Sequence, residues 1–438
     1  MNIGIPYLDR LLPLEVSDEN LLAVAEPNEI HTMGSAAEIV AAALGAPYAA
    51  SGGGILAAGK SPAAVSLDAF LSGARSVLVI VNDATRPTPT EVMLDALLPA
   101  FAHSGIATDR ITIIVATGAH RGPTEAEYRQ ILGRRFDALR PCCVAHDARN
   151  ETDMVDLGRT RNGTPIVLNK RLFESECIIA TGSVEPHYFA GFTGGRKAFL
   201  PGIAAFRTIE ANHKLALSAA ARSLALDGNP VHEDMMDALP LIKAPVFSLM
   251  TVLDKDQKVA AATAGDLMAS FYAAVETARR IFCVAIPAKA DVVVSVAKFP
   301  MDIDLYQSQK AIDNGALALK DGGTLVLVSS CRDGIGDEAY ANLLASAPTP
   351  ALAIAKIAEA YKLGYHKAAK MAAVSERATV VAKTVLDEGR LRSMFIEPIE
   401  SVQAAVDAGL ARARANGIRN PKVLVLPDGC VTVPEPSA

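Results

Sequence analysis

The sequence predicts an α/β protein of two domains, each built on a mainly parallel sheet with helices on its faces. Short runs of Val, Ile and Leu alternate with longer stretches of helical periodicity, which is typical of parallel strands buried on both faces. The chain has 438 residues, more than one compact core usually accommodates, and 50% of them are hydrophobic. Two separate hydrophobic cores can therefore be filled.

The strand candidates are short apolar runs that end in polar turns. In chain order they span residues 76–81, 111–116, 177–180, 246–252, 291–296, 324–329 and 423–426. Their alternation with helical stretches predicts parallel pairing. After the last run, residues 427–438 contain three prolines, and we expect this tail to be frayed.

Two helices have well-marked starts. Thr88 precedes Pro89, and Glu91 follows three residues after the threonine, which predicts a capped helix with proline in its first turn. Thr124 and Glu127 have the spacing of a second capping box. Both helices begin directly after predicted strands.

The domain boundary is predicted near residue 275. Residues 253–258 have the composition of a polar hairpin turn, and residues 261–286 suggest a small-residue hinge followed by a helix. The alternation of strands and helices resumes after Pro287. We therefore expect an N-terminal α/β domain over 1–275 and a C-terminal α/β domain over 276–438.

Composition excludes several classes of partner. The net charge is −6 with acidic and basic residues interspersed, which provides no basic surface for nucleic acid or an anionic membrane. The apolar runs are far shorter than a bilayer requires, and the first residues lack the pattern of an export signal. We expect a cytoplasmic protein whose partner is a small molecule.

The cysteines are expected to be reduced thiols in the core. Two are adjacent and none forms a C-x-x-C pair, which suits neither a zinc knuckle nor a simple disulfide framework. They are Cys142, Cys143, Cys177, Cys283, Cys331 and Cys430.

Reactive side chains gather in four turns that follow predicted strands. Open parallel sheets bind ligands at the carboxyl ends of their strands, so these turns are the first candidates for a site. They span residues 83–87, 118–121, 185–197 and 302–310.

Three histidines have the setting of functional residues. His120 and His187 lie in loops that leave strand ends, where they could exchange protons at neutral pH or simply stabilise the turns by hydrogen bonding. His213 lies on the apolar side of a helix predicted over about 204–223, where it is either a core residue bonded to a carbonyl or a metal ligand. The remaining histidines are expected to be structural or exposed. They are His31, His103, His146, His232 and His366.

Tyr306 and Lys310 form another candidate pair. They are four residues apart at a predicted helix start, so the phenol and the ammonium lie on one helix face. The pair could hold a carboxylate, or it could belong to an ordinary solvated face.

The glycine-rich segments do not match nucleotide-binding motifs. Residues 191–197 have the wrong glycine spacing for a Walker sequence, and Ala198 follows the lysine where Ser or Thr is required. Gly52, Gly53 and Gly54 do not follow a clear strand. Both a nucleotide-driven motor and an ordinary dinucleotide fold are therefore rejected as first interpretations.

Taken together, the four turns resemble the lactate racemase family that uses a nickel-pincer nucleotide. The resemblance extends in order and spacing over some 230 residues. It covers Asp83-x-Thr85-Arg86-Pro87, Gly118-x-His120-Arg121, Glu185-Pro186-His187, Ala190-Gly191, Gly194-Gly195-x-Lys197, Pro201-Gly202, Asn212-His213 and Tyr306-Gln307-x-x-Lys310.

The resemblance implies a covalently bound cofactor. This is pyridinium-3,5-bisthiocarboxylic acid mononucleotide, joined to Lys197 and carrying Ni(II), with His213 as the fourth nickel ligand. Three pincer donors and one imidazole suit square-planar Ni(II). Asp83, Thr85 and Arg86 would help to hold the nucleotide.

The implied reaction is racemisation or epimerisation at C2 of a 2-hydroxy acid. His120 and His187 would be the acid/base pair on opposite sides of the substrate, while the C2 hydride passes reversibly to the cofactor. Two bases are needed because the reaction inverts the centre in both directions. The cofactor performs the difficult step, and the protein supplies position and charge.

The resemblance also implies the substrate contacts. Arg86 would bind the cofactor phosphate or the substrate carboxylate, and Gln307 and Lys310, supported by Tyr306, would orient that carboxylate from the second domain. The active site would then lie in the cleft between the domains. Family members that act on lactate tend to have an apolar residue before the modified lysine, whereas this chain has Arg196. That cation would favour a second carboxylate or a polyol chain, or it would pair with a surface acid.

Two other functions remain open at this point. The first is a hydrolase or lyase that holds zinc or magnesium with His120, His187 and His213. The second is a protein that carries the pincer nucleotide without catalysing racemisation. If the cofactor is used, the enzymes that build it are expected partners.

Overall fold

The computed structural model describes residues 1–30, 34–49 and 64–437, so His31 and the Gly52 to Gly54 run lie outside the described residues. The chain forms two compact units. One, here called the continuous unit, comprises residues 29–281. The other, here called the split unit, comprises residues 1–28 together with 282–438.

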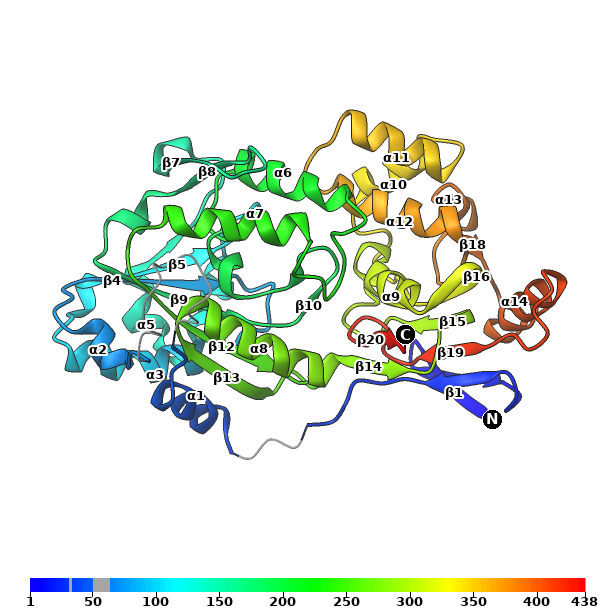
Figure 1. The fold of residues 1–438 in the computed structure, drawn as a ribbon, viewed down its shortest axis with the longest axis horizontal. Helices are drawn as coiled ribbons and strands as arrows, with labels where there is room; N and C mark the ends of the chain where they lie inside the picture. Colours follow the sequence, from blue (N-terminus) through cyan, green and yellow to red (C-terminus); the bar gives the residue numbers. More distant parts are fainter. Residues whose placement is uncertain (31–33, 50–63, 438) are drawn as a thin grey trace. The chain divides into compact units, whose positions relative to one another are not determined.

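The predicted boundary at 275/276 is wrong in two respects. It falls inside α8 (Leu267–Phe282), and the first 28 residues belong with the C-terminal part of the chain. The reason is that β3 (Leu21–Val24) pairs in parallel with β19 (Val423–Leu426). Pairing between segments so distant in sequence has no local signal. In Figure 1 the blue strand β1 accordingly belongs to the same unit as the orange and red elements.

The continuous unit is built on a six-stranded sheet with the order β13-β12-β9-β4-β5-β6. All neighbouring pairs are parallel except β12 and β13, which form an antiparallel hairpin. The strands are β4 (Val77–Asn82), β5 (Ile111–Ala116), β6 (Cys143–Ala145), β9 (Cys177–Ser183), β12 (Val246–Leu253) and β13 (Val259–Gly265). The four strands predicted in this region are confirmed, and the polar hairpin turn at 253–258 is confirmed. The expected hinge at 261 is instead part of β13.

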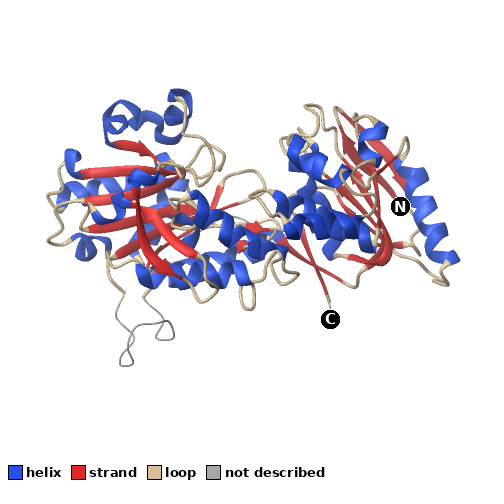
Figure 2. Cartoon of the chain, turned by 90° about the horizontal axis from the view of Figure 1, so that it is seen from above, coloured by secondary structure: helices blue, strands red, loops and turns tan. Residues whose placement is uncertain are grey.

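Helices and short strand pairs surround this sheet (Figure 2). The helices are α1 (Ala36–Gly45), α2 (Leu67–Leu71), α3 (Thr90–His103), α4 (Glu125–Leu132), α5 (Phe136–Leu139), α6 (Phe206–Lys214), α7 (Pro230–Ala238) and α8. The short strands are β7 (Met154–Arg159), β8 (Pro165–Asn169), β10 (Pro186–His187) and β11 (Gly191–Phe192). Apolar side chains of α3 pack with Val77, Val79 and Val81 in one buried cluster.

The two predicted helix starts have different outcomes. Thr124 accepts a hydrogen bond from the backbone N–H of Glu127, whose side chain completes the capping box, as predicted. Thr88 does not cap α3, because the N-cap position is occupied by Pro89 and makes no side-chain bond. The helix that carries His213 is also shorter than predicted, since α6 ends at Lys214.

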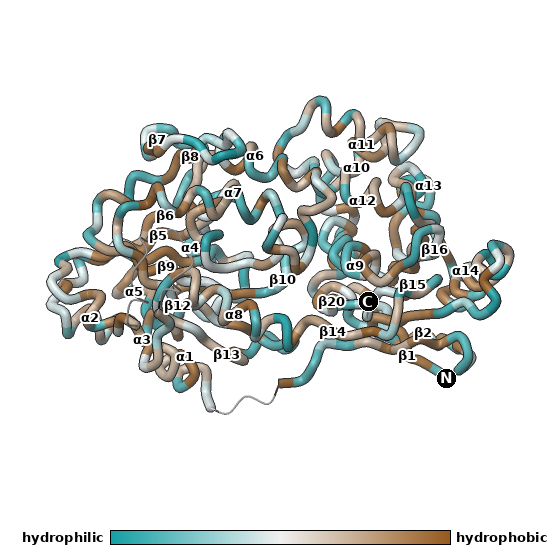
Figure 3. The backbone as a smooth tube through the Cα atoms, in the orientation of Figure 1, coloured by the Kyte–Doolittle hydropathy of each residue, from teal (hydrophilic) through white to brown (hydrophobic). Residues whose placement is uncertain are grey.

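The split unit is built on a second six-stranded sheet, which is parallel throughout and has the order β18-β17-β16-β15-β19-β3. Its strands are β3, β15 (Ala290–Val296), β16 (Leu319–Val328), β17 (Thr379–Lys383), β18 (Glu397–Pro398) and β19. Its helices are α9 (Leu305–Leu317), α10 (Glu338–Ala345), α11 (Pro350–Glu359), α12 (Tyr365–Arg377), α13 (Glu388–Arg392) and α14 (Val402–Ala415). The central strands are strongly hydrophobic (Figure 3), as burial on both faces requires.

Two small strand pairs complete the split unit. β1 (Asn2–Tyr7) and β2 (Arg10–Glu15) form an antiparallel hairpin, and β14 (Cys283–Ile286) pairs in parallel with β20 (Val433–Pro436). The tail is therefore not frayed over β20, because its backbone is paired despite two prolines. The predicted α/β class with mainly parallel sheets is confirmed in both units.

The thiols lie mostly in the core, as expected, although Cys142 is half-buried. All six cysteines are free thiols, and five of them are buried. Within the described ranges, no helix combines the length and the apolar character that a membrane span requires.

Candidate active site

The carboxyl ends of β4, β5 and β9 bring three of the predicted polar turns to one edge of the continuous unit's sheet. β4 lies between the other two strands, so Asp83, His120 and Glu185 follow neighbouring strand ends. Strand order alone therefore explains why these side chains meet, as the rule for parallel sheets predicts.

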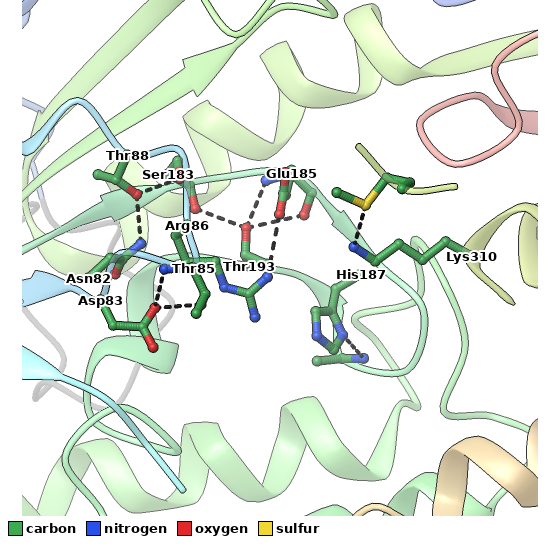
Figure 4. Close-up of polar contacts among 12 residues, drawn as sticks. Asn82, Asp83, Thr85, Arg86, Thr88, Ser183, Glu185, His187, Thr193 and Lys310 are labelled. Atoms are coloured by element: carbon green, nitrogen blue, oxygen red, sulfur yellow. Dashed lines mark hydrogen bonds and ion pairs between the residues drawn. The ribbon is translucent and has the colours of Figure 1, made fainter. Parts of the chain in front are cut away.

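Asp83 and His120 form a hydrogen-bonded pair. The Nδ1 atom of His120 lies 2.8 Å from Oδ2 of Asp83. The other carboxylate oxygen accepts bonds from the backbone N–H and the hydroxyl of Thr85 (Figure 4). Burial raises the pKa of Asp83, but the hydrogen bonds from His120 and Thr85 and the charge of Arg86 outweigh it, so the pKa is lowered. An ionised carboxylate only accepts, so Nδ1 of His120 is the donor and Nε2 can take a proton.

Arg86 faces the third turn. Its Nη1 atom lies 3.9 Å from Oε1 of Glu185, a loose ion pair in which both side chains are about 40% exposed (Figure 4). The hydroxyl of Thr193 donates to the carbonyl of Ser183 and accepts from the N–H of Glu185, each at 2.9 Å. The guanidinium thus remains accessible for an anionic ligand.

His187 lies on β10, and its Nδ1 atom accepts a hydrogen bond, whereas Nδ1 of His120 donates one. The donor to His187 is the N–H of Ala190 at 3.2 Å, so the neutral ring carries its proton on Nε2. Burial lowers the pKa of His187 well below its ordinary value, and the charges of Lys197 and Arg86 lower it further. His187 is therefore neutral at pH 7 and presents an Nε2–H donor.

Lys197 belongs to a short 3₁₀ helix, Gly195–Ala198. Burial lowers the pKa of its amine well below the ordinary value, and the positive charges of Arg86 and Arg196 act in the same direction. A neutral amine is the form that attacks a carbonyl or thiocarbonyl carbon.

The ring of Phe189 lies close to three of the predicted functional residues. Its ring centre lies 4.5 Å from that of His187 and 5.0 Å from that of His213, and the Nζ atom of Lys197 lies 5.7 Å from it. Sequence reasoning missed this residue, although an aromatic side chain two positions after His187 was the available signal. His187, Lys197 and His213 therefore share one neighbourhood.

His213 is 8% exposed near the end of α6. Its Nδ1 atom lies 3.2 Å from the side-chain oxygen of Asn212. Nδ1 is thus engaged by a side-chain amide.

The side chain of Arg196, for which a substrate contact was expected, turns toward the backbone of its own loop. The side chain is fully buried, and its guanidinium donates to the carbonyls of Ala190, Phe192 and Gly194. It also stacks on Phe271, with 4.5 Å between the guanidinium carbon and the ring centre. Arg196 therefore holds the loop between His187 and Lys197, and among the described residues no acidic side chain forms an ion pair with it.

The remaining predicted residues lie in the first turns of α9, in the split unit. Asp304 caps the helix by accepting a bond from the N–H of Gln307 at 2.6 Å. Burial raises the pKa of Tyr306 to about 12, so the phenol stays protonated, and Lys367 lies 3.8 Å above its ring. The amine of Lys310 donates to the thioether of Met301 at 3.2 Å (Figure 4). The predicted helix start is confirmed.

The alternative zinc site is not formed. In the parts of the chain that the structure describes, no group of three or more His, Cys, Asp or Glu side chains is placed to hold a metal ion. His120, His187 and His213 therefore do not make a three-histidine ligand set.

Comparisons with known proteins place these features in a family. Residues 7–224 match the model of the lactate racemase N-terminal domain, and residues 286–433 match that of the lactate racemase C-terminal domain. The chain belongs to the lactate racemase family. The resemblance seen in the motifs is thereby confirmed.

Individual members of the lactate racemase family agree with this assignment. The lactate racemase of Thermoanaerobacterium thermosaccharolyticum is 31% identical over 77% of this chain and 76% of its own length. The lactate racemase of Lactiplantibacillus plantarum is 29% identical over 98% of each chain. The apoprotein structure of the former enzyme superposes with a TM-score of 0.87, at 28% identity, over 99% of this chain and 100% of that one. A Thermotoga maritima protein shares the fold at a TM-score of 0.62 and 17% identity, covering 85% of this chain and 96% of that one.

Proposed function

We propose that this chain is a racemase or epimerase that inverts C2 of a 2-hydroxy acid with a nickel-pincer nucleotide bound to Lys197. The proposal depends mainly on one observation, which is that the ring of Phe189 lies close to Lys197, His187 and His213. The proposed attachment point of the cofactor, an acid/base residue and the proposed metal ligand are therefore neighbours. The names of the family members support the reaction class.

The residues fit such a cofactor. The amine of Lys197 has a lowered pKa, which favours the uncharged nucleophile needed to form a thioamide. The imidazole of His213, engaged at Nδ1 by Asn212, would bind nickel through Nε2. Asp83, Thr85 and the accessible guanidinium of Arg86 would hold the nucleotide. When bound, the nickel-pincer nucleotide supplies a hydride acceptor for the C2 hydrogen.

The two histidines then divide the proton transfer. His120, held through Nδ1 by Asp83, takes the proton of the C2 hydroxyl at Nε2. His187, neutral and protonated at Nε2, donates a hydrogen bond to the same oxygen from the other side. For the opposite enantiomer the roles would exchange, and His187 would accept a proton at Nε2 after the N–H of Ala190 has moved away from Nδ1, because only then can Nδ1 carry the ring proton.

The substrate carboxylate requires cationic and amide partners. Lys310 and Gln307, supported by Tyr306, are proposed for this role together with Arg86. Among the described residues the one polar contact of the Lys310 amine is the thioether of Met301, a weak acceptor, so its charge is available to a carboxylate.

Replacing Lys197 with Ala tests the proposal directly. In cells that contain the cofactor-building enzymes, the unmodified chain should gain the mass of the nucleotide and racemise a 2-hydroxy acid. Lys197→Ala should lose both, because no other amine is tethered. Intact-protein mass and chiral chromatography are the measurements.

Lys214→Ala is the matched control, because this lysine is exposed on α6 and should leave mass and activity unchanged. An adduct that persists in Lys197→Ala would contradict the assignment of the tether. An adduct in the unmodified chain without any change in enantiomeric excess would instead support a carrier of the cofactor.

A further inference from the structure

A chain of buried polar groups leads from α7 to the ring of His213. Asn212 and Asp234 are both fully buried. The side-chain nitrogen of Asn212 lies 2.9 Å from Oδ2 of Asp234 and 3.3 Å from the carbonyl oxygen of Val231. Its side-chain oxygen lies 3.2 Å from Nδ1 of His213. The other oxygen of Asp234 accepts a bond from the hydroxyl of Thr160 at 2.5 Å.

The hydrogen-bond donors and acceptors in this series of buried groups can be assigned in only one way. The carboxylate of Asp234 and the carbonyl of Val231 can only accept, so both face the NH₂ group of Asn212. The amide oxygen must then face His213. An amide oxygen only accepts, so Nδ1 of His213 carries the ring proton and Nε2 carries the lone pair.

We propose that Asp234 and Asn212 act as a relay that fixes the tautomer of His213 and thereby makes Nε2 the metal-binding nitrogen. The metal role of His213 rests on the proposed function, whereas the tautomer does not. Asp234 is a positioning residue in this scheme, because it acts on the metal ligand through Asn212 and contacts neither metal nor substrate. Partners of this kind orient ligand histidines and typically change metal affinity about 10- to 100-fold when they are replaced.

The burial of the Asp234 carboxylate without a cationic partner among the described residues indicates a specific role and not only packing between α6 and α7. In the described parts of the chain, no Lys or Arg nitrogen lies within 4.0 Å of its carboxylate, so neutral donors alone solvate it. Burying a carboxylate in this way is costly, and a neutral residue would join α6 to α7 at a lower free energy. A carboxylate differs from a neutral amide in one respect that matters here, because it cannot turn a donor toward Asn212.

Asp234→Asn removes that constraint with minimal change in shape. The new amide can present its NH₂ to the oxygen of Asn212, so the shorter of the two bonds that orient Asn212 no longer excludes the flipped amide. The 3.3 Å bond to the carbonyl of Val231 still favours the original orientation. In the flipped orientation Nδ1 of His213 would accept, and the ring proton would move to Nε2. Asp237→Asn is the matched control, since Asp237 lies on the same helix but pairs with Arg161 at the surface.

Long-range ¹⁵N–¹H correlation spectra of the full chain without cofactor report the tautomer at a pH where His213 is neutral, with His213→Gln assigning the signal. The unmodified chain and Asp237→Asn should show the proton on Nδ1, and Asp234→Asn should move a measurable fraction to Nε2, because only the bond to the carbonyl of Val231 still orients Asn212. An Nε2–H tautomer in the unmodified chain would overturn the relay without any variant. An unchanged tautomer in folded Asn212→Leu, in which the side chain at position 212 offers Nδ1 no acceptor, would also overturn it.

Asn212→Leu provides a second variant if Asp234→Asn does not fold, and it should abolish the preference for Nδ1–H. In protein loaded in cells, Asp234→Asn should retain the mass adduct on Lys197 but lose about 10- to 100-fold in nickel affinity. Unchanged nickel affinity would reject the role of the relay at the metal. If the unmodified chain gains no adduct, the proposed function is wrong. The tautomer measurement still tests the relay in that case, because it uses the chain without cofactor.

Discussion

His120 and His187 carry the same side chain but have opposite hydrogen-bond polarity at Nδ1. A carboxylate accepts from His120, whereas a backbone N–H donates to His187. Near neutral pH one ring therefore presents an acceptor at Nε2 and the other a donor. This difference suits an enzyme that must remove a proton on one side and support the same oxygen on the other.

Asp83→Asn is expected to lower kcat by about 10²-fold, the lower end of what a positioned general base contributes. The amide can donate to Nδ1 of His120 and so favours the tautomer whose Nε2 is already protonated. The measurement is kcat per nucleotide-loaded chain, with loading taken from intact mass because Asp83 is also proposed to hold the nucleotide. Asp156→Asn, at an exposed position, is the control. An unchanged kcat at full loading would refute the pairing.

Arg196→Met should lower the free energy of unfolding by about 3 kcal/mol, because buried carbonyls of the loop lose their donor. Denaturant unfolding measures this loss. Arg207→Met is the control, since Arg207 pairs with Glu151 at the surface and should change stability by less than about 1 kcal/mol. A variant of unchanged stability with a strongly raised KM would instead support the substrate role of Arg196.

The site illustrates what sequence reasoning can and cannot reach at single residues. Asp83, His120 and His187 were predictable because they follow strand ends, where parallel sheets gather their reactive groups. The burial of Arg196 was not predicted, because nothing in its neighbours along the chain indicates that its guanidinium turns inward to backbone carbonyls. Phe189 was missed for a related reason, since its importance lies in contacts with residues up to 24 positions away.

At the scale of elements, prediction succeeded where the signal is local. The central strands were recognised from their apolar composition, and the helix at Thr124 from its capping box. Thr88 has an equally good capping sequence but bonds instead to Asn82 and Ser183, which belong to β4 and β9. Because the hydroxyl of Thr88 already bonds to side chains of two strands, it does not cap the helix. The spacing of residues in the sequence does not reveal these strand partners.

Thr124→Ala should destabilise α4 by about 1 kcal/mol, because the N–H of Glu127 loses its side-chain acceptor. Hydrogen exchange of the first turn of α4 measures the loss locally. Thr88→Ala is a paired control, because it should leave exchange at the start of α3 unchanged. Faster exchange at the start of α3 in that variant would show that Thr88 caps the helix after all.

At the scale of the whole molecule, several buried histidines are held neutral by the fold. Burial lowers the pKa of His146, lowers that of His232 to about 3, and lowers that of His187 with help from Lys197. Unfolding returns each of them to about 6.5. The unfolded chain therefore binds more protons than the folded chain below this pH, so acidification favours unfolding.

The free energy of unfolding should decrease as the pH falls below about 6.5, by up to about 1.4 kcal/mol per pH unit for each such histidine. Urea unfolding at a series of pH values between 7 and 5 measures the slope. His232→Gln should reduce the slope of the free energy of unfolding against pH by up to the contribution of one buried histidine. His103→Gln, at an exposed position, should leave this slope unchanged. Stability that rises on acidification over this range would contradict the prediction.

The division of the chain was the least predictable feature, because the strand that completes one sheet comes from the opposite end of the sequence. The pairing of β3 with β19 has a consequence during synthesis. At about 5–20 residues per second, the first 28 residues leave the ribosome tens of seconds before their partner strand has been translated. Residues 29–281 are continuous and can fold in that interval, while β3 stays without its partner strand and exposes backbone groups to which a chaperone can bind.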